Sequence, residues 1–150
     1  MASKKAFITG ISGQDGSYLT EFLLDKGYEV AGLVRRSATG DLGNVEAVKE
    51  QIKIYYGDLQ SPESIALALL DFKPDEIYNL ASLSSPFASF SDKLGSIMIT
   101  GVGALHVFER AKEVVRESWE GCGRGNRRLY TLGRLCRREN RSAASSSCCR

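Results

Sequence analysis

The stretch KAFITGISGQDGSYLTEFL, residues 5–23, decides the fold of this chain. It starts as a short apolar run that ends in glycine, which predicts a strand over Ala6–Thr9. The apolar residues after the glycine recur at helical spacing, and they are Tyr18, Leu19, Phe22 and Leu23. A basic residue followed by glycine, Lys26–Gly27, is typical of a helix end. The stretch therefore predicts a strand, a glycine-rich loop and a helix.

The loop between strand and helix holds three glycines, Gly10, Gly13 and Gly16, each three residues from the next. In dinucleotide-binding βαβ units, such glycines allow a tight turn, a close approach of the backbone to a pyrophosphate, and packing of the helix on the strand. The N–H groups at the helix start then point at the anion. The spacing here is G-x-x-G-x-x-G, not the simple G-x-G-x-x-G. A glycine-rich turn without a ligand is the alternative, and the position after a strand and before a helix favours the phosphate site.

Strand and helix patterns alternate along the chain that follows. Further strands are expected over Glu29–Val34, Ile52–Tyr56 and Asp75–Ala81, and helices over part of 39–51, over 61–72 and, with weak spots, over 91–118. The second of these helices has Ser61 as its N-cap and Pro62 as its first residue. This order predicts an α/β fold, a Rossmann-like doubly wound parallel sheet that is incomplete. The stretch Asn126–Leu132 could supply a fifth strand.

Two adjacent arginines, Arg35 and Arg36, follow the second expected strand, and Arg35 lies 19 residues after Gly16. At about this distance NAD-binding proteins carry an acid for the ribose hydroxyl, whereas an arginine there accommodates a 2′-phosphate. A guanidinium binds phosphate through a fork of charge-assisted hydrogen bonds. The arginines therefore predict NADP as the cofactor. A solvated pair at a strand end is the alternative.

The composition is ordinary for a soluble globular protein, with 43% hydrophobic residues and a net charge of +2 among 150 residues. No run approaches the ~18 apolar residues of a transmembrane helix. The N-terminus has neither a signal-peptide core nor a small-residue cleavage site. We therefore expect a cytoplasmic protein with no membrane segment.

Residues 119–150 differ from residues 1–118. They hold eight arginines, no lysine, two acids and all four cysteines, which are Cys122, Cys136, Cys148 and Cys149. We expect an NADP-binding domain over 1–118, extended to 132 if the fifth strand forms, and then an Arg/Gly/Ser/Cys-rich tail. A product of a shifted reading frame, a disordered solvated tail and a functional basic arm are three interpretations of this tail, and we favour the first. Without a Cys-x-x-Cys pair we expect no metal site, and we expect no nucleic-acid partner.

The motifs ITGISGQDGSYL, LVRRS, YYGDLQSPES and KPDEIYNLAS resemble the extended short-chain dehydrogenase/reductase family, and within it the GDP-mannose 4,6-dehydratases. The resemblance covers about residues 4–116. It implies a loop around the pyrophosphate, arginines on the adenosine phosphate, a wall beside the adenine and a wall beside the nicotinamide. The cofactor-binding residues so implied are Gly10, Ser12, Gly13, Gln14, Asp15, Gly16, Arg35, Arg36, Ser37, Asp58, Leu59, Leu80, Ala81, Ser82 and Ser84.

The resemblance also implies an activity, a redox-neutral lyase that uses NADP and acts on GDP-mannose. Such an enzyme needs a tyrosine base whose pKa is lowered by a lysine in a Tyr-x-x-x-Lys pair. None of the six tyrosines has a lysine four residues later. The nearest match is Tyr130 with Arg134, and an arginine is a poor substitute because its pKa cannot be tuned as that of a lysine can. We therefore assign no catalytic residue and expect a cofactor-binding part that is inactive alone. Another nucleotide-sugar epimerase or reductase of this family, or a non-catalytic NADP-binding module with a basic interaction tail, are the alternatives.

Three single residues and one longer stretch add to these expectations. His106, the one histidine, lies in the expected long helix between apolar residues, and we expect a structural role for it. Leu83 and Gly95 depart from the polar and aromatic residues that are common in the family, which weakens the prediction of the nicotinamide side. The stretch Gly101–Val115 resembles part of the helices with which family members dimerise, so a homo-oligomer is a further expectation.

Overall fold

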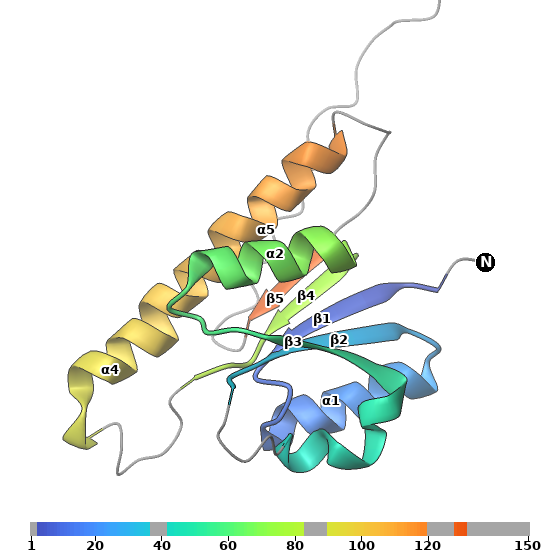
Figure 1. Ribbon diagram of the computed structural model, residues 1–150, viewed down its shortest axis with the longest axis horizontal. Coiled ribbons are helices and arrows are strands. Elements are labelled where there is room, and N and C mark those ends of the chain that lie inside the picture. Colours follow the sequence, from blue (N-terminus) through green and yellow to red (C-terminus); the bar gives the residue numbers. More distant parts are fainter. Residues whose placement is uncertain (1–2, 37–41, 83–89, 120–127, 132–150) are drawn as a thin grey trace, which may run out of the picture.

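The computed structural model describes residues 3–36, 42–82, 90–119 and 128–131 (Figure 1). In chain order the elements are β1 (Lys5–Thr9), α1 (Gln14–Asp25), β2 (Glu29–Val34), the 3-10 helix η1 (Gly43–Gln51), β3 (Ile52–Tyr56), α2 (Pro62–Phe72), β4 (Glu76–Asn79), α4 (Lys93–Ile97), the π-helical turn η2 (Met98–Val102), α5 (Gly103–Trp119) and β5 (Arg128–Thr131). None of the helices within these ranges is long and apolar enough to cross a membrane.

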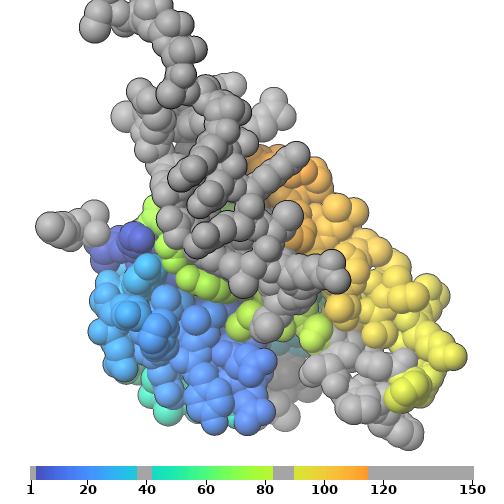
Figure 2. Space-filling model, turned by 180° about the vertical axis from the view of Figure 1, so that it is seen from behind, coloured from blue at the N-terminus to red at the C-terminus, as the bar shows by residue number. Residues whose placement is uncertain are grey.

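The strands form one parallel sheet in the order β3-β2-β1-β4-β5. Helix α1 and η1 lie on one face of this sheet, and α2 and α5 cover the other (Figure 1). Seen from behind, α1 in blue and the α4–α5 segment in yellow and orange lie on opposite sides of the green chain that leaves β4 (Figure 2). The predicted α/β fold with a doubly wound parallel sheet is confirmed.

The late elements also follow the sequence pattern. The predicted fifth strand is confirmed, because β5 pairs with β4 from Glu76↔Arg128 to Asn79↔Thr131. The expected long helix forms as α4, η2 and α5 in succession, and η2 is a π-helical turn that contains Gly101. The rest of the tail, residues 120–127 and 132–150 with all four cysteines, lies outside the described residues.

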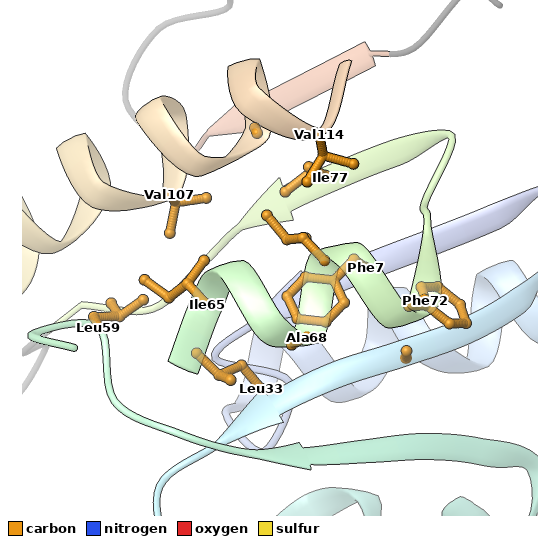
Figure 3. Packing of buried hydrophobic residues seen from close by; sticks show 12 residues of the cluster. Phe7, Leu33, Leu59, Ile65, Ala68, Phe72, Ile77, Val107 and Val114 are labelled. Atoms are coloured by element: carbon orange, nitrogen blue, oxygen red, sulfur yellow. The ribbon is translucent and has the colours of Figure 1, made fainter. Parts of the chain in front are cut away.

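The core has one cluster of apolar side chains on each face of the sheet. The cluster under α2 and α5 is the larger, and Figure 3 shows its side chains packed around Phe7 of β1. Its buried members are Phe7, Ala31, Leu33, Leu59, Ile65, Ala68, Leu69, Phe72, Ile77, Val107, Ala111 and Val114. The strands β1 and β2 are buried on both faces, as in other parallel sheets.

Helix α1 buries only part of the apolar face that its spacing suggests, since Leu23 is buried and Leu19 packs against the same core cluster. Its buried residues include Gly16, Ser17 and Thr20, whereas Tyr18 and Phe22 are 64% and 56% exposed. The reason is the short distance between the helix and the loop before it, since a Cβ on Gly16 would lie 2.8 Å from the Ile11 Cα. Only small residues fit against the loop, so the aromatic side chains face outward.

The edge strand β3 is attached to α2 by a cluster of polar groups. Lys53 Nζ and Tyr55 Oη both donate to Asp71 Oδ2, at 2.7 and 2.5 Å. These two hydrogen bonds, from Lys53 first and then from Tyr55, hold the pKa of the Asp71 carboxyl below its usual range. Burial, followed by the hydrogen bond to Asp71, raises the pKa of Tyr55. The cluster therefore attaches the edge strand β3 to the last turn of α2.

Helix α2 starts with the cap that the sequence predicts. Ser61 is the N-cap, its Oγ accepts a hydrogen bond from the Ser64 N–H at 3.4 Å, and Pro62 is the first residue of the helix. We expect Ser61→Ala to lower the free energy of unfolding by about 1 kcal/mol, because it removes this acceptor. Urea denaturation measures the change, and Ser61→Asn, which keeps an accepting oxygen, should stay close to the wild type. Equal unfolding midpoints for wild type and S61A would contradict the role of the cap.

Candidate functional site

A cavity of about 480 Å³ lies at the carboxyl ends of the strands. It lies between the loop after β1 and the chain after β4. The strand order reverses at this point, because β2 and β3 lie on one side of β1 and β4 and β5 lie on the other. Open α/β sheets bind ligands at such a switch point. Many of the residues that the sequence predicts for cofactor binding lie around it, namely Gly10, Ser12, Gly13, Gln14, Asp15, Gly16, Arg35, Asp58, Leu59, Leu80, Ala81 and Ser82.

Each glycine of the loop after β1 has its own steric reason. Gly10 adopts a φ of +73°, and a Cβ at this position would lie 2.7 Å from the Ala81 nitrogen. A Cβ on Gly13 would lie 3.2 Å from the Gly10 oxygen, which accepts a hydrogen bond from the Gly13 N–H at 3.0 Å. Gly16 lies against the backbone of Ile11. The loop is therefore a closely packed turn, and all three of its glycines line the cavity.

The start of α1 offers backbone donors to this cavity. Gly13 is the N-cap and has no side chain that could accept from the first N–H groups of the helix. Gln14, Asp15 and Gly16, the next three residues, line the cavity. The first N–H groups of a helix lack partners within the helix, and the helix dipole favours negative charge beside them. This end of α1 can therefore hold an anion such as a pyrophosphate.

The two arginines after β2 occupy different positions. Arg35 lines the cavity. Arg36 does not, and its Cζ lies 5.8 Å from the ring centroid of Tyr56 at the end of β3. A guanidinium over an aromatic face is held there by a cation–π interaction. Arg35 therefore lies at the cavity and Arg36 against the neighbouring strand, while Ser37 lies outside the described residues.

The wall on the β4 side is held by buried polar contacts. Thr9 Oγ1 donates to Asn79 Oδ1 at 2.5 Å, and the Leu80 N–H donates to the Thr9 oxygen at 3.1 Å. Both Thr9 and Asn79 are buried, so this pair fixes the ends of β1 and β4 side by side. Ala81 and Ser82 continue this wall, and Ser84 lies outside the described residues.

The wall on the β3 side is a hydrogen-bonded turn. Asp58 Oδ1 accepts from the Gln60 N–H at 2.9 Å, which is the ordinary role of an aspartate after a strand. Asp58 and Leu59 nevertheless line the cavity as well. The turn therefore places both residues beside the cavity, and their role in binding stays a prediction.

Several cavity residues were not found by sequence reasoning. They are Thr9, Leu33, Val34, Gly57 and Ile99. The first four sit at strand ends, and the βαβ pattern could have pointed to them. Ile99 belongs to η2, 40 residues after Leu59, and no sequence signal places it at this cavity.

The part of the chain that the structure describes contains no group of three or more His, Cys, Asp or Glu residues placed to hold a metal ion. The 150 residues contain no Tyr-x-x-x-Lys pair. Tyr130, the nearest match, lies in β5, and its Arg134 lies outside the described residues. The site thus combines donors for a nucleotide with no acid–base pair of that type.

Comparison with known proteins identifies relatives of the chain. The family model for GDP-mannose 4,6 dehydratase matches residues 7–131. GDP-mannose 4,6 dehydratase 1 of Arabidopsis thaliana is 43% identical over 117 residues, which are 73% of this chain and 32% of that protein. GDP-mannose 4,6 dehydratase of Homo sapiens is 42% identical over 115 residues, 71% of this chain and 31% of that protein. The chain spans about a third of the length of these curated relatives.

Solved structures with the same arrangement include nucleotide-sugar epimerases. UDP-glucose 4-epimerase of Thermus thermophilus, in complex with NAD, superposes with a TM-score of 0.65 at 29% identity, over 74% of this chain and 34% of that one. The Bordetella bronchiseptica enzyme WbmH, in complex with NAD+, has a TM-score of 0.59 at 27% identity, over 76% of this chain and 37% of that one.

Proposed function

Because the chain belongs to the GDP-mannose 4,6-dehydratase family, we propose that its cavity binds NADP as the cofactor site of an enzyme that converts GDP-mannose to GDP-4-keto-6-deoxymannose. The curated relatives that match it carry this enzyme name at about 40% identity. The three glycines fit the proposal, because Gly10, Gly13 and Gly16 line the cavity with backbone and without side chains. The volume of about 480 Å³ is also typical of cofactor sites.

One observation carries the choice of NADP over NAD, the position of Arg35. Arg35 follows the end of β2 and lines the cavity where an acid would hold the ribose hydroxyls of NAD. A guanidinium attracts a 2′-phosphate and a carboxylate repels it. Arg35 is therefore the residue that we assign to the 2′-phosphate.

The remaining parts of the cavity have separate tasks under this proposal. The N–H groups at the start of α1 bind the pyrophosphate. The turn with Asp58 and Leu59 holds the adenine, since β3 lies beside β2 in the sheet. Leu80 to Ser82 hold the nicotinamide on the opposite side. When bound, NADP supplies a reversible acceptor for the hydride that the dehydration requires.

We further propose that this chain binds the cofactor without turning over a sugar nucleotide by itself. A tyrosine base with a nearby lysine would have to take the proton from the sugar hydroxyl, and the 150 residues hold no such pair. In this proposal the NADP-binding domain spans residues 1–118 and extends to 132 through β5, ahead of the Arg/Gly/Ser/Cys-rich tail.

Binding and turnover assays test both statements. We expect NADPH to bind about tenfold more tightly than NADH, because the 2′-phosphate adds charge-assisted hydrogen bonds. The quenching of protein fluorescence on titration measures the two dissociation constants. Incubation with NADP and GDP-mannose should yield no keto sugar. Equal affinities would refute the choice of NADP, and formation of a 4-keto product would refute the lack of turnover.

A nucleotide-sugar epimerase is the second candidate, and the structural neighbours favour it. Two of them hold NAD at 29% and 27% identity. A tighter complex with NADH than with NADPH would support this candidate. The identity of about 40% to GDP-mannose 4,6-dehydratases and the position of Arg35 support the first.

A further inference from the structure

His106 makes a long-range contact with the candidate site. Its Nδ1 lies 2.8 Å from the Leu59 carbonyl oxygen, across 47 residues of sequence. A carbonyl oxygen only accepts, so Nδ1 must carry the proton and donate it. His106 is half-buried on α5, and it is the one histidine of the chain.

The residue that accepts this hydrogen bond belongs both to the core and to the cavity wall. The Leu59 side chain is buried in the cluster with Ile65 and Val107, which Figure 3 shows beside it. Leu59 also lines the cavity. Helix α5 lies directly against it, because a Cβ on Gly103 would be 2.9 Å from the Leu59 Cβ. Helix α5 thus holds Leu59 by its side chain and by its carbonyl group.

The neighbouring residue is held from the other helix on this face. The Asp58 N–H donates to Ser64 Oγ at 3.2 Å, and this hydroxyl lies within hydrogen-bond distance of the Asp58 and Ser61 oxygens. Ser64 belongs to the first turn of α2. The turn after β3 is therefore held by both helices of this face, α2 through Ser64 and α5 through His106.

We propose that His106 is a positioning residue for the adenosine half of the cofactor site. By donating to the Leu59 carbonyl, it fixes the cavity wall at the end of β3, next to Arg35 at the end of β2. This inference rests on the proposed binding of NADP, and it adds a residue that does not itself line the cavity. Pre-ordering the turn lowers the conformational entropy that binding would otherwise cost.

The consequence is a local effect on one half of the ligand. Loss of the hydrogen bond should loosen Asp58 and Leu59, and it should weaken the binding of molecules that contain the adenosine. The wall formed by Leu80 and Ala81 is held by the separate contact between Thr9 and Asn79. Nicotinamide mononucleotide, which lacks the adenosine, should therefore bind unchanged.

The test compares three variants of the full chain. His106→Leu removes the donor. His106→Asn keeps an N–H donor near the position of Nδ1. Leu105→Ala is the matched control, since it changes the preceding residue of α5, which is 55% exposed. Amide hydrogen exchange at Asp58 and Gln60 without ligand, and the dissociation constants of adenosine 2′,5′-bisphosphate and nicotinamide mononucleotide, are measured for each variant.

We expect H106L to exchange the Asp58 and Gln60 amides about tenfold faster, with no change at Ile8 in β1. Its dissociation constant for adenosine 2′,5′-bisphosphate should rise about 5- to 10-fold. H106N should return both the exchange rates and the dissociation constant most of the way to the wild-type values, and L105A should match the wild type. Unchanged exchange in H106L, equal weakening of both ligands, or no rescue by H106N would each overturn the proposal. If the wild type binds neither ligand, the proposed cofactor site fails, and the exchange measurements still decide whether His106 fixes the turn.

Discussion

Replacing Gly10 with alanine should lower the free energy of unfolding by about 3 kcal/mol and abolish measurable binding of NADPH. Two effects add at this position. Gly10 has a φ of +73°, where an L-residue costs about 1–2 kcal/mol. The new Cβ would also lie 2.7 Å from the Ala81 nitrogen and 2.8 Å from the Ala81 Cα, so the loop after β1 must move away from the chain after β4. This movement separates the two walls of the cavity.

Gly27 provides the matched control for Gly10. Its φ is +75°, almost the same, but a Cβ there would have nothing within 4 Å. Gly27→Ala should therefore cost about 1 kcal/mol of stability and leave the affinity for NADPH unchanged. Urea denaturation and NADPH titration of both variants separate backbone strain from collision. If G10A and G27A lose the same stability and both keep NADPH binding, the close approach of Gly10 to Ala81 is not what shapes the site.

Replacing Arg35 with aspartate should weaken NADPH binding by about 100-fold and change NADH binding by less than about threefold. The substitution removes the guanidinium at the cavity edge and places a carboxylate there, which repels a 2′-phosphate and can accept from ribose hydroxyl groups. The ratio of the two dissociation constants, measured by titration, reports the change in preference. The protein should remain folded, because Arg35 is exposed.

The matched control is Arg36→Asp, which changes the same charge one residue later. Arg36 packs over Tyr56 and does not line the cavity, so R36D should weaken NADPH binding far less than R35D. A similar loss in both variants would mean that the arginines act by overall charge and not by direct contact. A loss of NADH binding equal to that of NADPH in R35D would refute the assignment of Arg35 to the 2′-phosphate.

Most of the fold could be predicted from the sequence, because its signals are local. Apolar runs bounded by glycine gave β1, β2 and β3 within about one residue, and Ser61 with Pro62 marked the start of α2. The alternation of strands and helices required parallel strands joined by helical crossovers, and this predicts a parallel sheet with helices on both faces. The loop of glycines and the position of Arg35 could also be predicted, since strand ends in a parallel sheet meet at one edge.

Contacts between distant segments could not be predicted, since no local pattern encodes them. Helical spacing identified α1 and its buried Leu23, but not the exposure of Tyr18 and Phe22, which follows from the close approach of Gly16 to Ile11. Ile99 of η2 lines the cavity although it lies 40 residues after Leu59 in the chain.

The sequence by itself therefore determined the order of the elements, the glycine-rich loop after β1 and the arginine at the cavity edge. Each of these depends on residues that are neighbours in the chain. The tertiary structure alone decided that Arg36 turns to Tyr56 and that His106 of α5 reaches Leu59 after β3. The first contact exists because β2 and β3 lie side by side in the sheet, and the second because α5 packs on the apolar cluster that contains Leu59.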